Sequence, residues 1–152
     1  MGRVTETRTH KWGWGILLVV SAMLVLNGVG WFFMGPSLST LEQDTGVPLS
    51  EFRQAYPAVA DSIAVNARQV AIWFMAFGLL ALLLALDGLR HGSRQALSAM
   101  WILVAAPAAI GINVLVGGQS PFGAGMLVVA AIALIGQLLA RKGLAAQTNV
   151  SG

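Results

Sequence analysis

Six polar side chains in this sequence occur within or beside long apolar stretches, where little water is available to bond to them. They are Asn27, Asn66, Arg68, Gln69, Asn113 and Gln119. An amide in hydrocarbon requires a hydrogen-bond partner, so Asn27 and Asn113 are expected to face other helices and not lipid. If Arg68 points the same way, the group could bind a carboxylate, a phosphate headgroup or another small anion, because a guanidinium donates two parallel hydrogen bonds.

Two simpler interpretations of the same residues stay open. The stretch DSIAVNARQVAIWFMAFGLLALLLAL places Arg68 at the entrance to an apolar segment. A long basic side chain at such a position commonly extends to the lipid headgroups and needs no further function. The two asparagines could likewise tie helices together without binding a ligand. The choice depends on whether Asn27, Arg68 and Asn113 converge in the folded chain.

The composition shows which kind of element must position these side chains. Of the 152 residues, 57% are hydrophobic and only 10% are charged, far from the composition of an ordinary soluble domain. An α-helix needs about 20 apolar residues to cross a bilayer. The sequence contains four such segments, at about 12–34, 67–88, 97–116 and 123–141. It therefore predicts an all-α fold, a polytopic membrane protein whose transmembrane domain (12–142) is a four-transmembrane-helix bundle between tails 1–11 and 143–152.

The distribution of positive charge predicts the orientation of this bundle. Seven of the nine basic residues fall on one side of the four segments: Arg3, Arg8, Lys11, Arg90, Arg94, Arg141 and Lys142. Loops rich in Lys and Arg stay in the cytoplasm. Both termini are therefore expected to be cytoplasmic, in the cytoplasmic (inner) membrane of a prokaryote, with the lipid bilayer as the first partner.

The predicted outer loop, residues 35–66, is longer than an ordinary connection. Its segment PLSEFRQAYP places Leu49, Phe52 and Tyr56 near one face at helical spacing, with Ser50 as a possible N-cap. This pattern favours a short amphipathic helix on the outer membrane surface, and an ordinary polar loop is the alternative. Pro57 suits the first turn of the helix that follows.

Small residues at helical spacing predict close helix packing. Three rows show this pattern: Ala67 and Ala71; Ala105, Ala109 and Asn113; and Ala133, Gly136 and Ala140. Such rows allow helix backbones to approach in a membrane. Contacts within one bundle explain them most simply, and a homo-oligomer or contact with other membrane proteins is the alternative.

The sequence offers little for catalysis or for a cofactor. The absence of cysteine removes thiol chemistry and thiolate metal sites. His10 and His91 are predicted to lie in the cytoplasmic flanks, and no carboxylate lies within the apolar core of a predicted span. The methionines are dispersed, and the basic residues form no stripe suited to nucleic acid. We therefore expect no enzymatic activity, no metal, no cofactor and no nucleic-acid partner.

The first half of the chain resembles small four-helix prokaryotic integral membrane proteins of uncharacterised activity. The stretch NGVGWFFMGPSLSTLEQDTGVPLSEFRQAYP and the segment that follows carry this resemblance, with Asn27, Pro57 and Arg68 as landmarks. The expected function is that of a non-enzymatic accessory or lipid-interacting scaffold subunit. The alternative is a small transporter or binding protein for an anionic solute or lipid headgroup, bound in an outward-facing polar pocket.

Overall fold

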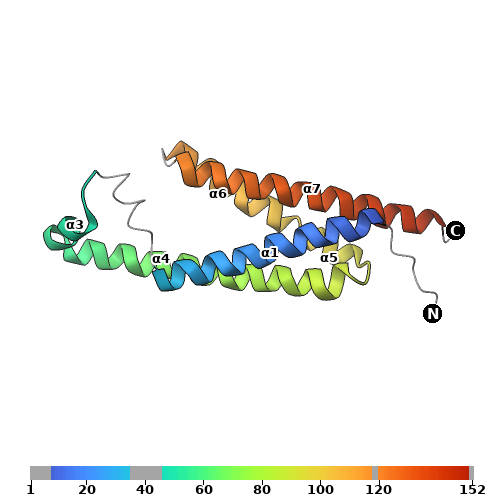
Figure 1. Ribbon diagram of the computed structural model, residues 1–152, viewed down its shortest axis with the longest axis horizontal. Helices are drawn as coiled ribbons and strands as arrows, with labels where there is room; N and C mark the ends of the chain where they lie inside the picture. The colour runs from blue at the N-terminus through green and yellow to red at the C-terminus, as the bar shows by residue number, and fades with distance from the viewer. Residues whose placement is uncertain (1–7, 35–45, 118–119, 151–152) are drawn as a thin grey trace. The chain divides into compact units, whose positions relative to one another are not determined.

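The structure is a computed structural model that describes residues 8–34, 46–117 and 120–150. These residues form helices and turns with no strand, which confirms the all-α fold class. The helices are α1 (Arg8–Met34), α3 (Leu49–Ala55), α4 (Pro57–Leu83), η1 (Leu84–Leu89), α5 (Arg94–Ala99), α6 (Ile102–Val116) and α7 (Ser120–Val150) (Figure 1).

Within this part of the chain, four helical stretches are long and apolar enough to cross a membrane. They are Arg8–Phe33, Pro57–Leu89, Arg94–Val116 and Phe122–Ala146. The first two stretches begin earlier than the apolar pattern predicts, at Arg8 and at Pro57. Proline suits the second start because its ring fixes φ near the helical value, and because an N–H in the first turn would have no helical partner.

The chain divides into two compact units. The first unit comprises Met1–Ala22 and Leu80–Gly152, and the second comprises Met23–Leu79. Helices α1 and α4 each contribute residues to both units.

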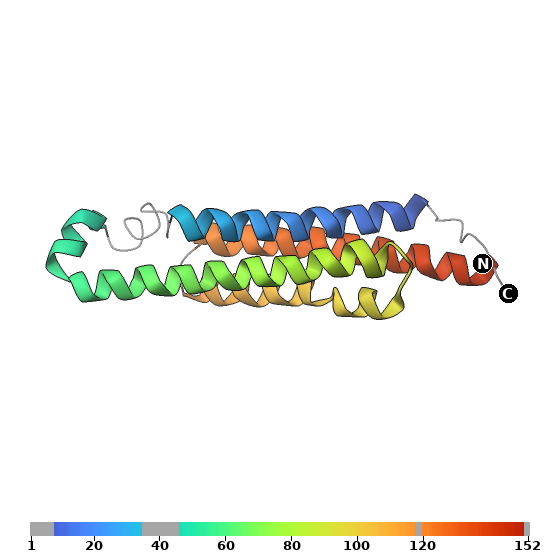
Figure 2. The same cartoon turned by 90° about the horizontal axis from the view of Figure 1, so that it is seen from below.

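In the first unit, small residues bring the start of α1 against the later part of α7 (Figure 2). A Cβ atom added at Gly13 would lie 2.7 Å from the carbonyl oxygen of Gly136 and 2.7 Å from Cα of Ala140. A Cβ atom at Gly136 would lie 2.8 Å from Cγ2 of Ile16. Ala133, Gly136 and Ala140 are all buried, which confirms the row predicted on this helix.

Helices α6 and α7 also pack closely in the first unit, and Figures 1 and 2 both show them side by side. A Cβ atom at Gly111 would lie 2.9 Å from the carbonyl oxygen of Gly123. The buried residues of α6 are Leu103, Pro107 and Gly111. The predicted row of Ala105, Ala109 and Asn113 is exposed, so that prediction of an intrachain contact is wrong. Helix α6 is apolar on every side, and its composition therefore does not select the packed face.

The third apolar stretch is interrupted between α5 and α6, at Met100 and Trp101. The N–H of Trp101 donates to the carbonyl of Ser98 at 3.3 Å. In an uninterrupted α-helix the same N–H would bond to the carbonyl of Leu97. The interruption therefore leaves the Leu97 carbonyl to be bonded by another group.

The second apolar stretch ends in the π-helix η1. The N–H of Arg90 donates to the carbonyl of Ala85 at 3.2 Å, and the N–H of Gly92 donates to the carbonyl of Leu89 at 3.0 Å. Gly92 has a φ of 75°, which glycine adopts without strain. The last carbonyls of a helix lack helical partners, so side chains that donate to them stabilise the end of this stretch.

The second unit is built on the remainder of α1 and most of α4. A Cβ atom at Gly28 would lie 2.8 Å from the carbonyl oxygen of Ala71, and one at Gly78 would lie 2.8 Å from the backbone nitrogen of Val25. Backbones so close require residues without bulky side chains. The rings of Trp31 and Phe74 meet edge to face with centroids 6.3 Å apart.

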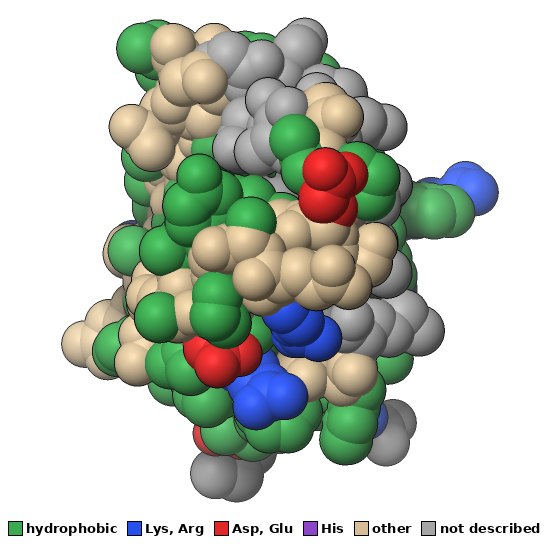
Figure 3. Space-filling model, turned by 90° about the vertical axis from the view of Figure 1, so that its left-hand side faces the viewer, with side chains coloured by type: hydrophobic (Ala, Val, Ile, Leu, Met, Phe, Trp, Pro, Cys, Tyr) green, Lys and Arg blue, Asp and Glu red, His purple; other side chains and the backbone are tan. Residues whose placement is uncertain are grey.

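Helix α3 precedes α4 in the second unit, and the tilted rings of Phe52 and Tyr56 lie 5.6 Å apart between centroids. The helix begins at Leu49 after Pro48, with no side-chain cap. Ser50 lies inside the helix, so its prediction as the N-cap is wrong. Figure 3 views the side of the molecule where α3 lies, and side chains of both charge signs are mixed there with hydrophobic ones.

Candidate functional site

The structure places the residues predicted to bind a ligand on three helices. Asn27 lies on α1 and Asn113 on α6, and both are exposed. Asn66, Arg68 and Gln69 lie on α4 and are also exposed. Gln119 lies outside the described residues.

On α4, the polar group lies beside the packed face and not on it. The buried positions of this helix in the second unit are Ala60, Ala67, Ala71, Phe74 and Gly78. Successive residues of an α-helix point about 100° apart. Asn66 and Arg68 flank Ala67 in the sequence and are therefore turned away from the packed face on either side.

The proposed convergence of Asn27, Arg68 and Asn113 stays a prediction. Asn27 and Arg68 belong to the second unit, and Asn113 belongs to the first. The hydrogen bonds that the structure shows between buried side chains and distant parts of the chain lie elsewhere, in the first unit.

Among the described residues of the first unit, three polar side chains are buried: His10, Ser21 and Gln137. His10 is only 1% exposed, so it is packed within the unit, and its position in a cytoplasmic flank stays a prediction. Its Nε2 donates to the carbonyl of Leu89 at 2.9 Å, and its Nδ1 lies 3.5 Å from the carbonyl oxygen of Ala140. A single ring therefore connects the start of α1 to the end of η1 and to α7.

Trp14 lies one turn after His10 on α1 and bonds to the same π-helix. Its Nε1 donates to the carbonyl of Ala85 at 2.7 Å. Side chains four residues apart lie on one face of a helix. The two donors thus add a second hydrogen bond to the carbonyls of Leu89 and Ala85, which also accept from the backbone N–H groups of Gly92 and Arg90.

Gln137 bonds to the carbonyl that the interruption of the third stretch leaves open. Its Nε2 donates to the carbonyl of Leu97 at 2.6 Å, and its side chain is fully buried. A carbonyl oxygen accepts and does not donate, so the amide nitrogen must face Leu97 and the oxygen must face away. Within the part of the chain that the structure describes, Oε1 of Gln137 has no hydrogen-bond partner.

A cavity of about 410 Å³ lies beside Gln137 in the first unit. Its lining residues come from α5, from the turn that follows α5 and from α7: Arg94, Leu97, Ser98, Trp101, Gln137, Arg141, Leu144 and Ala145. Leu97, Gln137 and Leu144 are buried, whereas Arg94 and Arg141 are exposed. The cavity therefore has a buried floor and a basic rim.

Sequence reasoning did not predict that His10, Ser21 and Gln137 are buried. The spacing of His10 and Trp14 contained a signal, because two N–H donors one turn apart on an apolar helix suggest a common partner. No comparable signal joined Arg94 to Arg141, which are far apart in the chain.

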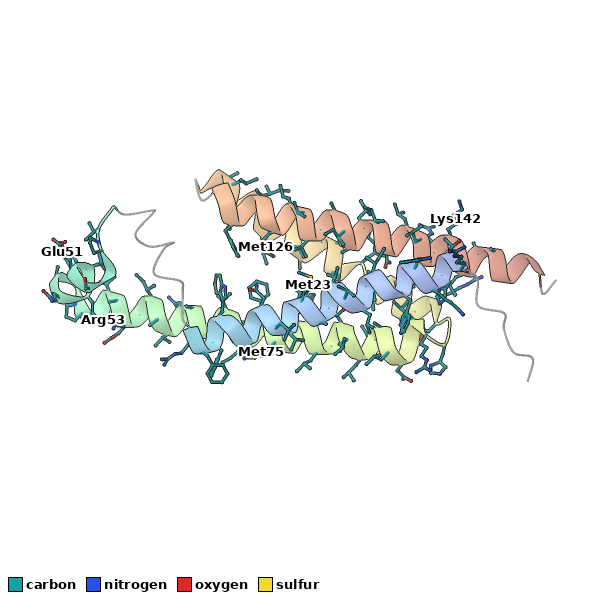
Figure 4. All side chains as sticks on the ribbon, in the orientation of Figure 1. Met23, Glu51, Arg53, Met75, Met126 and Lys142 are labelled. Carbon is teal, nitrogen blue, oxygen red and sulfur yellow. The ribbon has the colours of Figure 1, made fainter. Side chains whose placement is uncertain are left out.

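Residues with affinity for metals do not gather in the described part of the chain. Among residues 8–34, 46–117 and 120–150, no group of three or more His, Cys, Asp or Glu side chains could hold a metal ion. Figure 4 shows Met23 on α1, Met75 on α4 and Met126 on α7. Met126 is buried and Met23 is exposed, as expected of side chains that fill separate positions.

No protein-family model, curated protein or solved structure matches the chain. The resemblance to small four-helix prokaryotic membrane proteins therefore stays a prediction, and functional argument rests on the geometry of this chain.

Proposed function

We propose that this chain is a non-enzymatic, multi-pass protein of the prokaryotic cytoplasmic membrane that acts as an accessory or lipid-interacting scaffold subunit. The exposure of its apolar helices carries the proposal. Only 22 to 33% of an apolar 18-residue window in each of the four stretches is buried within the chain. Large side chains such as Leu26, Trp73 and Val116 are 70, 74 and 84% exposed. A surface of this kind is stable against lipid or against the apolar helices of a partner.

The polar contacts of the first unit support a structural role. His10, Trp14 and Gln137 each donate to a backbone carbonyl of another helical segment. Such bonds hold helices in register, and the bond from Gln137 also pairs the Leu97 carbonyl that the interruption of the third stretch leaves open.

The orientation with both termini in the cytoplasm is supported by charges gathered at one end of the first unit. His10 bonds to Leu89, which fixes the start of α1 beside the end of η1. Arg94 and Arg141 line one cavity. The basic residues near Leu89, Arg94 and Arg141 therefore lie at one end of the first unit. The positive-inside rule expects such an end on the cytoplasmic side of the membrane. Reporter fusions after Gly92 and at the C-terminus should both give cytoplasmic signals, and a periplasmic signal from either one would contradict the orientation.

The exposed row on α6 offers a surface for a partner. Ala105 and Ala109 are small, four residues apart and exposed, which would let another helix approach closely. The partner would be a membrane protein or a second copy of the chain. Helix α3, with its aromatic pair, would lie at the outer membrane surface.

The scaffold function is tested by purifying the tagged chain from native membranes and identifying proteins that accompany it. Ala109→Leu should lower the yield of a specific partner at least about fivefold, because a larger side chain prevents close helix approach. Ala131→Leu is the matched control, since Ala131 is an exposed alanine on α7. Purified chain in liposomes should move no anion; solute flux by the chain alone would overturn the scaffold function.

The alternative function, an outward-facing site for an anionic solute or headgroup, is favoured by the exposure of Asn66, Arg68 and Gln69 within one turn of α4. If the site exists, Arg68→Ala should abolish anion binding while Arg68→Lys retains part of it, because lysine keeps the charge but not the paired donors. Equal binding by the wild-type chain and Arg68→Ala would exclude the site.

A further inference from the structure

Asn27 is an exposed amide within a long apolar helix. It lies on α1, six residues before the end of the apolar stretch Arg8–Phe33. That stretch has 26 residues, and about 20 are enough to cross the hydrocarbon core, so a centred stretch keeps Asn27 inside the core. Among the described residues, no hydrogen bond joins its side chain to another group. An unpaired amide in hydrocarbon is costly, so Asn27 favours a partner outside its own chain.

The residues around Asn27 leave room for that partner. Met23 and Leu26 are 59 and 70% exposed, and Phe33 is 80% exposed (Figure 4 labels Met23). A Cβ atom at Gly30 would meet nothing within 4 Å. Successive residues of a helix point about 100° apart, so Met23 and Gly30 both point within about 60° of Asn27. Glycine on an open face lets a second helix backbone approach closely. These five residues of α1 are called the Asn27 face.

The chemistry of the Asn27 face fits a second copy of this chain. An amide carries both donors and an acceptor, so two Asn27 side chains across a twofold axis donate to each other's oxygens. Two copies inserted in the same orientation hold Asn27 at the same depth, and this match needs no polar group from another protein. The other four residues of the face are apolar or glycine. A single asparagine on such a face specifies the register and the number of paired helices.

Asn113 on α6 shows why depth matters. It is also exposed, but it lies only three residues before the end of the apolar stretch Arg94–Val116. In that stretch of 23 residues, this position is at the boundary of the hydrocarbon core, where water and headgroups bond to an amide. The need for a protein partner is therefore greater at Asn27.

We propose that two copies of the chain pair in the membrane through the Asn27 face. The two α1 helices run parallel and cross at Gly30, and the two Asn27 amides form reciprocal hydrogen bonds. The inference rests on the proposed placement of the chain in a membrane. It leaves the exposed row on α6 free for another partner, and it gives Asn27 a role separate from the ligand site predicted around Arg68.

Thiol crosslinking of the full chain in membranes tests the pairing, because the chain contains no cysteine of its own. Met23→Cys places a thiol on the Asn27 face. Val29→Cys is the matched control, since Val29 is 37% exposed and points about 200° from Asn27. With a short thiol-specific crosslinker, Met23→Cys should give at least about fivefold more product of twice the chain's mass than Val29→Cys. Equal yields would overturn the proposal, and so would a Met23→Cys product of another mass, which would show a different protein on this face.

Substitutions of the amide measure its contribution to pairing. Energy transfer between copies labelled at the C-terminus, in liposomes of increasing lipid content, gives the Kd of the pair. Asn27→Leu should raise this Kd at least about fivefold, whereas Asn27→Gln keeps a donor and an acceptor and should retain most of the association. Asn113→Leu removes an exposed amide from α6 and should have no effect. An equal loss in Asn113→Leu and Asn27→Leu would overturn the assignment to α1.

Substitutions of glycine test the crossing point in the same liposomes. Gly30→Leu should raise the Kd at least about fivefold, because the larger side chain keeps the helices apart. Gly15→Leu is the matched control, since a Cβ atom at Gly15 also meets nothing within 4 Å and lies about 22 Å away along the helix. Equal Kd values for these two variants would refute the crossing at Gly30.

Extraction of the chain from membranes by alkaline carbonate separates this inference from the proposed function, because it tests membrane insertion alone. A chain that resists extraction but stays monomeric in liposomes would refute the pairing and leave the scaffold function standing. A chain that carbonate extracts would overturn the membrane placement on which both rest.

Discussion

Replacement of Gly13 by alanine should destabilise the first unit although alanine is the better helix former. The added Cβ would lie 2.7 Å from the carbonyl oxygen of Gly136, whereas ordinary contact begins at 3.4 Å. Helices α1 and α7 must therefore separate by more than 0.7 Å at this point, because the backbone nitrogen of Ala140 would lie closer still to the added Cβ. The obstructing atoms are backbone atoms, which cannot move aside as a flexible side chain can. Overpacking of this kind costs about 1–3 kcal/mol.

The same change two residues later provides the control. A Cβ atom at Gly15 would meet nothing within 4 Å. Gly15→Ala should therefore be neutral or stabilising by up to about 1 kcal/mol, through helix propensity alone. Because both variants gain the same propensity, the difference between them reports the contact between α1 and α7.

Thermal unfolding of the purified chain in detergent, followed by circular dichroism, measures this difference. For a chain of this size, 1 kcal/mol changes the Tm by about 2–4 °C. We expect the Tm of Gly13→Ala to be about 2–12 °C below that of Gly15→Ala. If Gly13→Ala is as stable as Gly15→Ala, helices α1 and α7 do not approach each other closely at Gly136.

Two further predictions concern the side chains that bond to η1. His10→Ala should lower the free energy of unfolding by about 1–3 kcal/mol, because a buried ring that bonds one helical segment to the Leu89 carbonyl of another is removed; His91→Ala removes only an exposed, local bond to the Asp87 carbonyl and should have a much smaller effect in the same melts. Trp14→Phe keeps the ring but removes the Nε1 donor, so it should cost about 1 kcal/mol in detergent unfolding, and Trp12→Phe, at a residue 62% exposed, should cost nothing. Equal effects within either pair would show that these hydrogen bonds do not stabilise the fold.

The amino-acid sequence by itself determined the all-α class and the presence of four long apolar helices. Both follow from local properties, since the length of an apolar run and its composition do not depend on distant residues. The small residues Ala67, Ala71 and Gly136 were also identified correctly as buried. Here too the signal is local, because close helix approach tolerates only short side chains.

The candidate site was less predictable, because its residues depend on which helix faces meet. Sequence reasoning grouped Asn27, Arg68 and Asn113 by their similar depth in the predicted spans. The depth of a residue does not determine which way its side chain points from the helix. Arg68 proved to be exposed and turned from the packed face of α4.

Only the tertiary structure decided which side of each apolar helix packs. In water, the buried face of a helix is marked by hydrophobic residues opposite polar ones. In a chain suited to lipid, both faces are apolar, and this mark is lost. The sequence therefore favoured Ala105 and Ala109 on α6, whereas Pro107 and Gly111 are buried. For the same reason, only the folded chain brings Gln137 to the open carbonyl of Leu97, forty residues earlier in the sequence.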